Sequence, residues 1–100
     1  MSGSDFEEAV TDVIERLGTG EVVSNGWVAA EAGYPRQARR VGSLLARGAG
    51  GLPWWRVVRA DGRLAAPHPN EQAAALRAEG VVVENGVVRR PKPLSPHEGA

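Results

Sequence analysis

The sequence feature that most constrains the fold is a pair of short helical segments, separated by a glycine and a proline, over residues 25–47. The first segment, NGWVAAEAG, predicts a helix of two turns that Ser24 or Asn25 caps and that Gly33 ends. The proline that follows suits the first turn of a second helix, which we expect over residues 36–47. The apolar residues that mark its buried side are Val41, Leu44 and Leu45. Two short helices joined by a tight turn that contains glycine form a helix-turn-helix pattern.

Further helices and strands are expected on both sides of this motif. Apolar spacing predicts a first helix that Ser4 or Asp5 caps, and its buried residues are Phe6, Val10, Ile14 and Leu17. Residues 54–66 and 81–88 each predict a β-hairpin, and their turns are Asp61–Gly62 and Asn85–Gly86. Residues 70–80 predict a helix between the hairpins, with Asn70 as its cap, an apolar face of the Ala74/Leu76 type and a stop at Gly80.

The fold class expected from these elements is α+β, mainly α: a winged-helix-like helix-turn-helix domain with short β-hairpins. Residues 1–90 are expected to form one domain, near the size at which a single hydrophobic core becomes sufficient. Residues 91–100 contain three prolines and no apolar periodicity, which predicts a disordered C-terminal tail. The chain has no apolar run of membrane-spanning length and its first residues are acidic, so a cytoplasmic location, at the nucleoid when bound to DNA, is the default expectation.

The charges are strongly segregated although the net charge is zero. Residues 1–33 hold seven acidic residues and one arginine, whereas residues 34–63 hold seven arginines and one acidic residue. A basic middle third favours a phosphate-bearing partner, although pairing with the acidic first third is an equal alternative on charge alone. The chain has no cysteine, which excludes disulfides, thiolate metal sites and cysteine nucleophiles. His68 and His97 have no second ligand near them in the sequence, so we expect no metal and no cofactor.

Two adjacent tryptophans open the first predicted hairpin, in the stretch GLPWWRVV. Neighbouring residues of a strand point to opposite faces, so Trp54 and Trp55 cannot both belong to one simple core. One of them is expected in the core and the other to face something else. The third tryptophan, Trp27, stands at an apolar position of the first short helix and is expected in the core.

Four segments give the chain a resemblance to a known family. They are GEVVS at 20–24, VAAEAGYPRQARRVGSLL at 28–45, PWWRVVRADGRL at 53–64 and LRAEGV at 76–81. From about Phe6 to Val88 the chain resembles the C-terminal DNA-binding domain of O6-alkylguanine-DNA alkyltransferases. It is still more similar to the cysteine-less branch of that family, the alkyltransferase-like proteins.

The resemblance implies a role for each tryptophan of the pair. Active family members carry Pro-Cys-His-Arg-Val, and the cysteine takes the alkyl group from guanine, so Trp54 replaces the acceptor and is expected to face a lesion pocket. Pure core packing is the alternative for Trp54. Trp55 replaces the activating histidine and is expected to fill space, with a functional role as the alternative. Glu79 matches the glutamate that orients that histidine, so it is expected to have lost its partner and to be structural, and Arg56 is expected to tie the hairpin to the helices.

The resemblance also implies how DNA is held. The family rotates a nucleotide out of the stack from the minor groove, and an arginine of the second helix fills the space. The matching finger here is Arg39. Arg36, Arg40 and Ser24 are expected to contact the DNA backbone. Trp54, Val57 and Asn25 are expected to line the lesion pocket, with Asn25 where the family usually has tyrosine.

The favoured hypothesis is non-enzymatic recognition of DNA damage. An indole is not a soft nucleophile, so alkyl transfer is rejected. The chain would bind O6-alkylguanine in duplex DNA as a monomer, flip the base, and pass the lesion to nucleotide excision repair proteins, which are partners by resemblance only. One alternative is a helix-turn-helix transcription regulator without lesion specificity, although its second helix offers few base-reading side chains. Another is a family member that has kept the fold and lost DNA binding.

Overall fold

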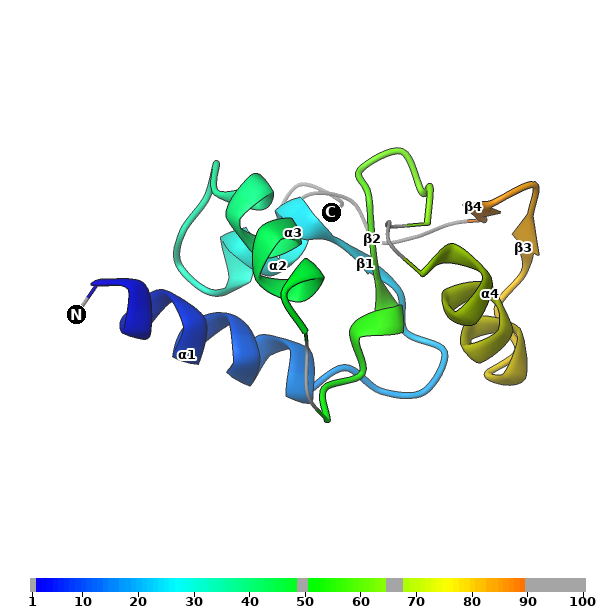
Figure 1. The fold of residues 1–100 in the computed structure, drawn as a ribbon, viewed down its shortest axis with the longest axis horizontal. Coiled ribbons are helices and arrows are strands. Elements are labelled where there is room, and N and C mark those ends of the chain that lie inside the picture. The colour runs from blue at the N-terminus through cyan, green and yellow to red at the C-terminus, as the bar shows by residue number, and fades with distance from the viewer. Residues whose placement is uncertain (1, 49–50, 65–67, 90–100) are drawn as a thin grey trace.

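The computed structural model describes residues 2–48, 51–64 and 68–89. Its elements in chain order are α1 (Ser2–Glu15), β1 (Val23–Ser24), α2 (Asn25–Glu31), α3 (Ala38–Ala46), the 3-10 turn η1 (Trp54–Arg56), β2 (Val57–Val58), α4 (Pro69–Ala78), β3 (Val83–Glu84) and β4 (Val87–Val88). Strands β1 and β2 lie between the α1–α2–α3 group and the group formed by α4, β3 and β4 (Figure 1). The expected fold class, mainly α with short strands, is therefore confirmed. No helix among the described residues is long and apolar enough to cross a bilayer.

The hydrophobic core has two parts, and β2 divides them. Val57 packs with residues of α1, α2 and α3, whereas Val58 packs with residues of α4, β3 and β4. Adjacent strand residues point to opposite faces, so a strand of only two residues serves both parts. The apolar residues predicted for the first helix are all buried: Phe6, Val10, Ile14 and Leu17. That helix begins at Ser2, so the predicted cap at Ser4 or Asp5 is wrong.

The helix-turn-helix prediction is confirmed by α2 and α3, which pack against each other. Ser24 caps α2, and its hydroxyl accepts a hydrogen bond from the backbone N–H of Trp27 at 3.0 Å. Trp27 is buried, as expected. The second helix begins at Ala38, two residues later than predicted. The reason is Arg36, whose φ of +76° belongs to the left-handed region and cannot continue into a right-handed helix.

The hairpin predicted over residues 54–66 is wrong in its pairing. Trp54–Arg56 form a 3-10 turn, so the argument from strand alternation does not apply to the two tryptophans. Strand β2 pairs in parallel with β1, Val23 with Val57 and Ser24 with Val58. A tight turn does occur at Asp61–Gly62, with Gly62 at a φ of +86°, but Arg63 then pairs with Val87 of β4. The valines of β2 meet a strand that lies far away in sequence, which a local pattern does not reveal.

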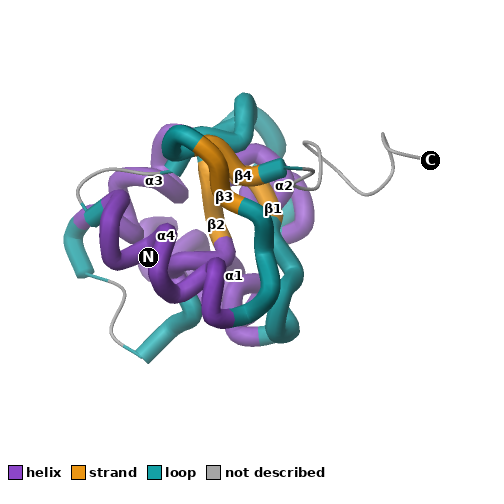
Figure 2. Tube along the Cα trace, turned by 90° about the vertical axis from the view of Figure 1, so that its right-hand side faces the viewer, coloured by secondary structure: helices purple, strands orange, loops and turns teal. Residues whose placement is uncertain are grey.

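The last third of the described chain follows the predictions more closely. The hairpin at Asn85–Gly86 is confirmed, since β3 and β4 pair antiparallel and both turn residues have positive φ. Figure 2 shows β3 and β4 next to each other. Helix α4 starts at Pro69 with His68 at its cap position, so the Asn70 cap is wrong. Its buried residues are Gln72, Ala73 and Leu76, so Ala74 is exposed and the predicted apolar face is only partly right.

Candidate nucleic-acid interface

The first turn of α3 and the turn before it carry the three arginines predicted for DNA contact. Arg36, Arg39 and Arg40 are all exposed. Arg36 holds its positive φ in the turn, and Gln37 occupies the cap position of α3 without a side-chain capping bond. A left-handed non-glycine residue costs roughly 1–2 kcal/mol, and such strain clusters at functional sites.

Arg39 and Arg40 differ in their surroundings. The Arg40 guanidinium lies 4.0 Å from the centre of the Phe6 ring, so it ties α3 to α1 by a cation–π contact. Directly after α3, Arg47 forms an exposed ion pair with Glu7 of α1. Within the described residues, the Arg39 side chain has neither an ion pair nor a hydrogen bond. Arg39 is therefore the arginine in the first turn of α3 whose guanidinium has no partner among the described residues that would compete with DNA.

Asn25 and Ser24 lie where α2 begins, beside α3. A Cβ atom built on Gly42 of α3 would lie 3.7 Å from the Asn25 amide nitrogen, an ordinary van der Waals distance, so the Asn25 side chain lies beside α3. Asn25 is partly exposed. The Ser24 side chain is 1% exposed and its hydroxyl serves the cap of α2. Ser24 thus fixes the helix end at which Asn25 stands.

Trp54, which the resemblance places at the acceptor position, lies on η1 and is partly exposed. Its ring meets the Trp55 ring edge to face, with centroids 6.1 Å apart and planes at 81°. On another side it meets the His68 ring at 6.3 Å and 63°. The Val57 side chain is buried, and its carbonyl accepts a hydrogen bond from Gln72 at 2.9 Å, so Val57 belongs to the support of η1.

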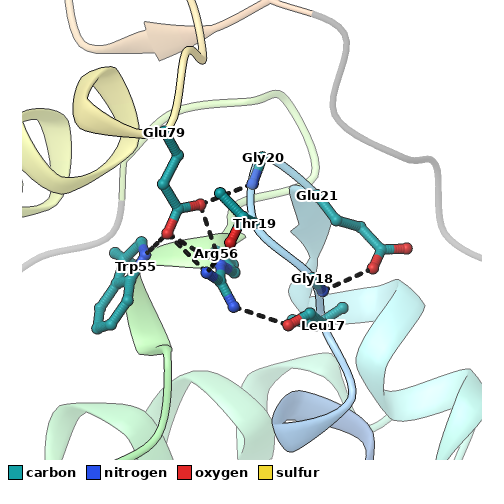
Figure 3. A network of polar contacts seen from close by, with 8 residues as sticks. All are labelled: Leu17, Gly18, Thr19, Gly20, Glu21, Trp55, Arg56 and Glu79. Carbon is teal, nitrogen blue, oxygen red and sulfur yellow. Dashed lines mark hydrogen bonds and ion pairs between the residues drawn. The ribbon is translucent and has the colours of Figure 1, made fainter.

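Figure 3 shows a network of polar contacts around Glu79. One member of this network is Trp55, whose ring contacts the Trp54 ring. The carboxylate accepts hydrogen bonds from Trp55 Nε1 at 2.8 Å, from the backbone N–H of Gly20 at 2.8 Å and from Arg56 at 2.7 Å. Arg56 also donates to the carbonyl of Leu17 at the end of α1, at 2.7 Å. The expectation that Glu79 has lost its partner is therefore wrong. Arg56 was expected to tie a hairpin to the helices; it ties η1 instead to the segments that directly follow α1 and α4.

The charge of Glu79 is strongly favoured in this network. The hydrogen bond from Arg56 is the largest cause that lowers the pKa of Glu79 from 4.5 to about 2, with smaller contributions from Gly20 and Trp55 against the effect of burial. The Arg56 and Glu79 side chains are each only 12% exposed. This carboxylate is therefore ionised at neutral pH and acts as an acceptor only.

Two residues of the site have roles that the sequence did not indicate. Gln72 is fully buried on α4, and its amide donates to the carbonyls of Trp55 at 3.1 Å and of Val57 at 2.9 Å. The His68 ring lies beside the Trp54 ring, although the sequence gives no sign of this contact. A polar residue inside an otherwise apolar helical face is the signal that could have singled out Gln72.

The fold and the exposed arginines define a class of protein: a helix-turn-helix domain of the nucleic-acid-binding kind. The family described as 6-O-methylguanine DNA methyltransferase, DNA binding domain, matches residues 5–81. The chain therefore belongs to this family, together with the alkyltransferase-like proteins that lack the acceptor cysteine. The sequence contains no cysteine, so it supplies no thiol that could accept an alkyl group.

Similar proteins come from bacteria and a yeast. A protein named DNA base-flipping protein in Escherichia coli K12 is 42% identical over 78% of this chain, and the chain spans 64% of that relative's length. A protein of the same name in Vibrio parahaemolyticus is 37% identical over 71% of this chain and 75% of its own length. Two structures of the S. pombe protein have the same fold. They are Atl1 with damaged DNA containing O6-carboxymethylguanine (TM-score 0.74, 23% identity, 89% of this chain and 90% of that one) and ATL with DNA (TM-score 0.72, 23% identity, 90% of each).

Proposed function

We propose that this chain recognises O6-alkylguanine in duplex DNA, flips the modified base out of the helix and holds it against Trp54 without chemical conversion. Arg39 enters the duplex from the minor groove and occupies the space that the base leaves. Arg36 and Arg40 contact phosphates, and Asn25 lies at the pocket rim. The lesion then passes to nucleotide excision repair proteins, because the chain has no cysteine to take the alkyl group.

Two features carry the proposal: a partly exposed Trp54, which the resemblance places at the acceptor position, and an exposed Arg39 on the second helix of the motif, which forms no ion pair or hydrogen bond with the described residues. An indole offers a flat apolar surface on which a purine can stack, worth roughly 1–3 kcal/mol per base. A guanidinium is planar and charged, so it suits both stacking and the negative potential of the minor groove. The names and DNA complexes of the relatives support the same function.

A regulator that reads sequence in the major groove is the second candidate. It gains support from the helix-turn-helix geometry alone, because α3 presents exposed side chains in its first turn. The two candidates differ in what they discriminate. A lesion sensor distinguishes O6-methylguanine from guanine in one sequence, whereas a regulator distinguishes one sequence from another.

Binding titrations test the proposal. One duplex contains a single O6-methylguanine and the other has guanine at that position, and each is titrated at two salt concentrations with the wild type, Arg39→Ala and Trp54→Ala. Arg16→Ala, on an exposed arginine that follows α1, is the control for loss of one positive charge. We expect tighter binding to the lesion duplex, and a loss of about tenfold or more of that preference in both site variants.

Equal and salt-sensitive binding to the two duplexes by the wild type would contradict the proposal and favour the regulator. Absence of DNA binding even at low salt would contradict both, and would mean that the chain has kept the fold without DNA affinity.

A further inference from the structure

We propose that Trp55 is a positioning residue for lesion recognition: its indole N–H, bound to Glu79, holds the neighbouring Trp54 in the orientation that receives the flipped base. This inference rests on the proposed function and deepens it. It assigns to Trp55, at the edge of the proposed pocket, a directional hydrogen bond rather than space filling alone.

The first support is that two consecutive residues of η1 are anchored to one carboxylate. Trp55 Nε1 lies 2.8 Å from Glu79 Oε2, and Arg56 Nη2 lies 2.7 Å from the same oxygen. Glu79 itself lies just after α4, and the Gly20 N–H fixes its other oxygen at 2.8 Å. Two adjacent side chains held by one fixed acceptor determine both the position and the rotation of the short turn that carries Trp54 (Figure 3).

The second support comes from the backbone of the same turn. Gln72 donates to the carbonyls of Trp55 and Val57, one on each side of Arg56. Gln72, Leu76 and Glu79 are four and three residues apart, so they lie on one face of α4 and its end, and the outer two hold η1. Because Gln72 holds the backbone of η1, only the side chains of η1 can still change orientation. The hydrogen bond to Glu79 fixes the orientation of the Trp55 side chain.

The third support is the contact through which Trp55 acts on Trp54. The two rings meet edge to face at 6.1 Å and 81°, a favourable arrangement worth roughly 0.5–1.5 kcal/mol beyond burial. Because the Trp55 ring is fixed at its nitrogen, it presents a fixed wall to Trp54. Without the bond to Glu79, the Trp55 ring would be held by packing alone, and the orientation of Trp54 would be less well defined.

The test compares Trp55→Phe and Trp55→His with the wild type, using the O6-methylguanine duplex and its guanine counterpart. Phenylalanine keeps an aromatic ring but has no donor for Glu79, whereas histidine has a ring N–H that can restore it. We expect Trp55→Phe to weaken binding to the lesion duplex about tenfold with little change for the guanine duplex. Trp55→His should regain most of the preference, and Trp27→Phe, a core tryptophan outside this network, should keep it.

Three results would overturn the inference. The first is an unchanged lesion preference in Trp55→Phe, which would make Trp55 a packing residue. The second is an equal weakening for both duplexes, which would indicate a general defect of the fold. The third is a folded Trp55→His variant without lesion preference. If Trp55→Phe does not fold, the result with Trp55→His alone decides whether Trp55 is a positioning residue. A wild type with no lesion preference would instead overturn the proposed function.

Discussion

The helix-turn-helix side of the molecule and the α4–η1 side differ in whether their charged side chains have partners within the protein. On α3, Arg39 is exposed and has no ion pair or hydrogen bond within the described residues. Beside α4, the nearly buried Arg56 and Glu79 bind each other, and both also bind the backbone near the end of α1. One region leaves a charge available for a ligand, and the other uses charges to fix a short turn.

In the proposed function, the first region contributes affinity for DNA, and the second fixes the geometry around Trp54. Phosphate contacts need exposed cations and carry no sequence information, so these side chains need no fixed partner in the free protein. A pocket for one modified base needs groups held within a fraction of an ångström, and such precision comes from packing and surrounding hydrogen bonds. Changes on the α4–η1 side should therefore affect stability first, whereas changes in the turn before α3 should affect DNA affinity first.

Glu79→Ala should have the largest effect on stability. It leaves the Arg56 guanidinium largely buried without its carboxylate, and the loss of one member of a buried pair costs roughly 3–5 kcal/mol. Urea denaturation measures the free energy of unfolding. Glu84→Ala is the matched control, because its ion pair with Arg89 is exposed and should be worth about 0–1 kcal/mol. Equal losses in the two variants would contradict the contrast between the regions.

Stability should also fall in acid because of Glu79. Its pKa is about 2 in the folded chain and near 4.5 as a free side chain, so the unfolded state binds a proton first. The contribution of Glu79 is fully present above pH 4.5 and decreases as the pH falls toward 2, by at most about 3 kcal/mol. Denaturation at several pH values should show this decrease in the wild type and a smaller one in Glu79→Gln. Parallel curves would show that Glu79 does not have the lowered pKa.

Arg36 should show the opposite balance, with a small effect on stability and a clear effect on DNA binding. Arg36→Ala and Arg36→Gly should both weaken binding to lesion and guanine duplexes alike, and reduce the slope of log affinity against log salt by about 1. Glycine adopts the φ of +76° without strain, so the glycine variant should be about 1 kcal/mol more stable than the alanine variant. A loss confined to the lesion duplex would show that Arg36 acts in the pocket instead.

Local patterns predicted the elements whose causes are local. The spacing of Phe6, Val10 and Ile14 gave the first helix, the Asn85–Gly86 pair gave a hairpin, and the two short segments at 25–47 gave the helix-turn-helix motif. Each of these follows from side-chain periodicity or turn chemistry within about a dozen residues.

The support of the candidate site could not be predicted in this way. The stretch WWRVV has the aromatic and β-branched composition of a strand, yet Trp54–Arg56 form a 3-10 turn because α4 holds them through Gln72 and Glu79. Glu79 and Gly20 are 59 residues apart, and Arg56 and Leu17 are 39 apart. Bonds between such distant segments depend on the completed fold, which overrides local propensity.

Base flipping is the central claim, and the fluorescence of 2-aminopurine placed next to O6-methylguanine tests it most directly. Its emission rises when the neighbouring base leaves the stack. The account predicts a rise on addition of the wild-type protein, a much smaller rise with Arg39→Ala at saturating protein, and little change in the guanine duplex. Saturated binding of the lesion duplex without any rise in fluorescence would contradict the account, because the lesion would then be recognised inside the stacked helix.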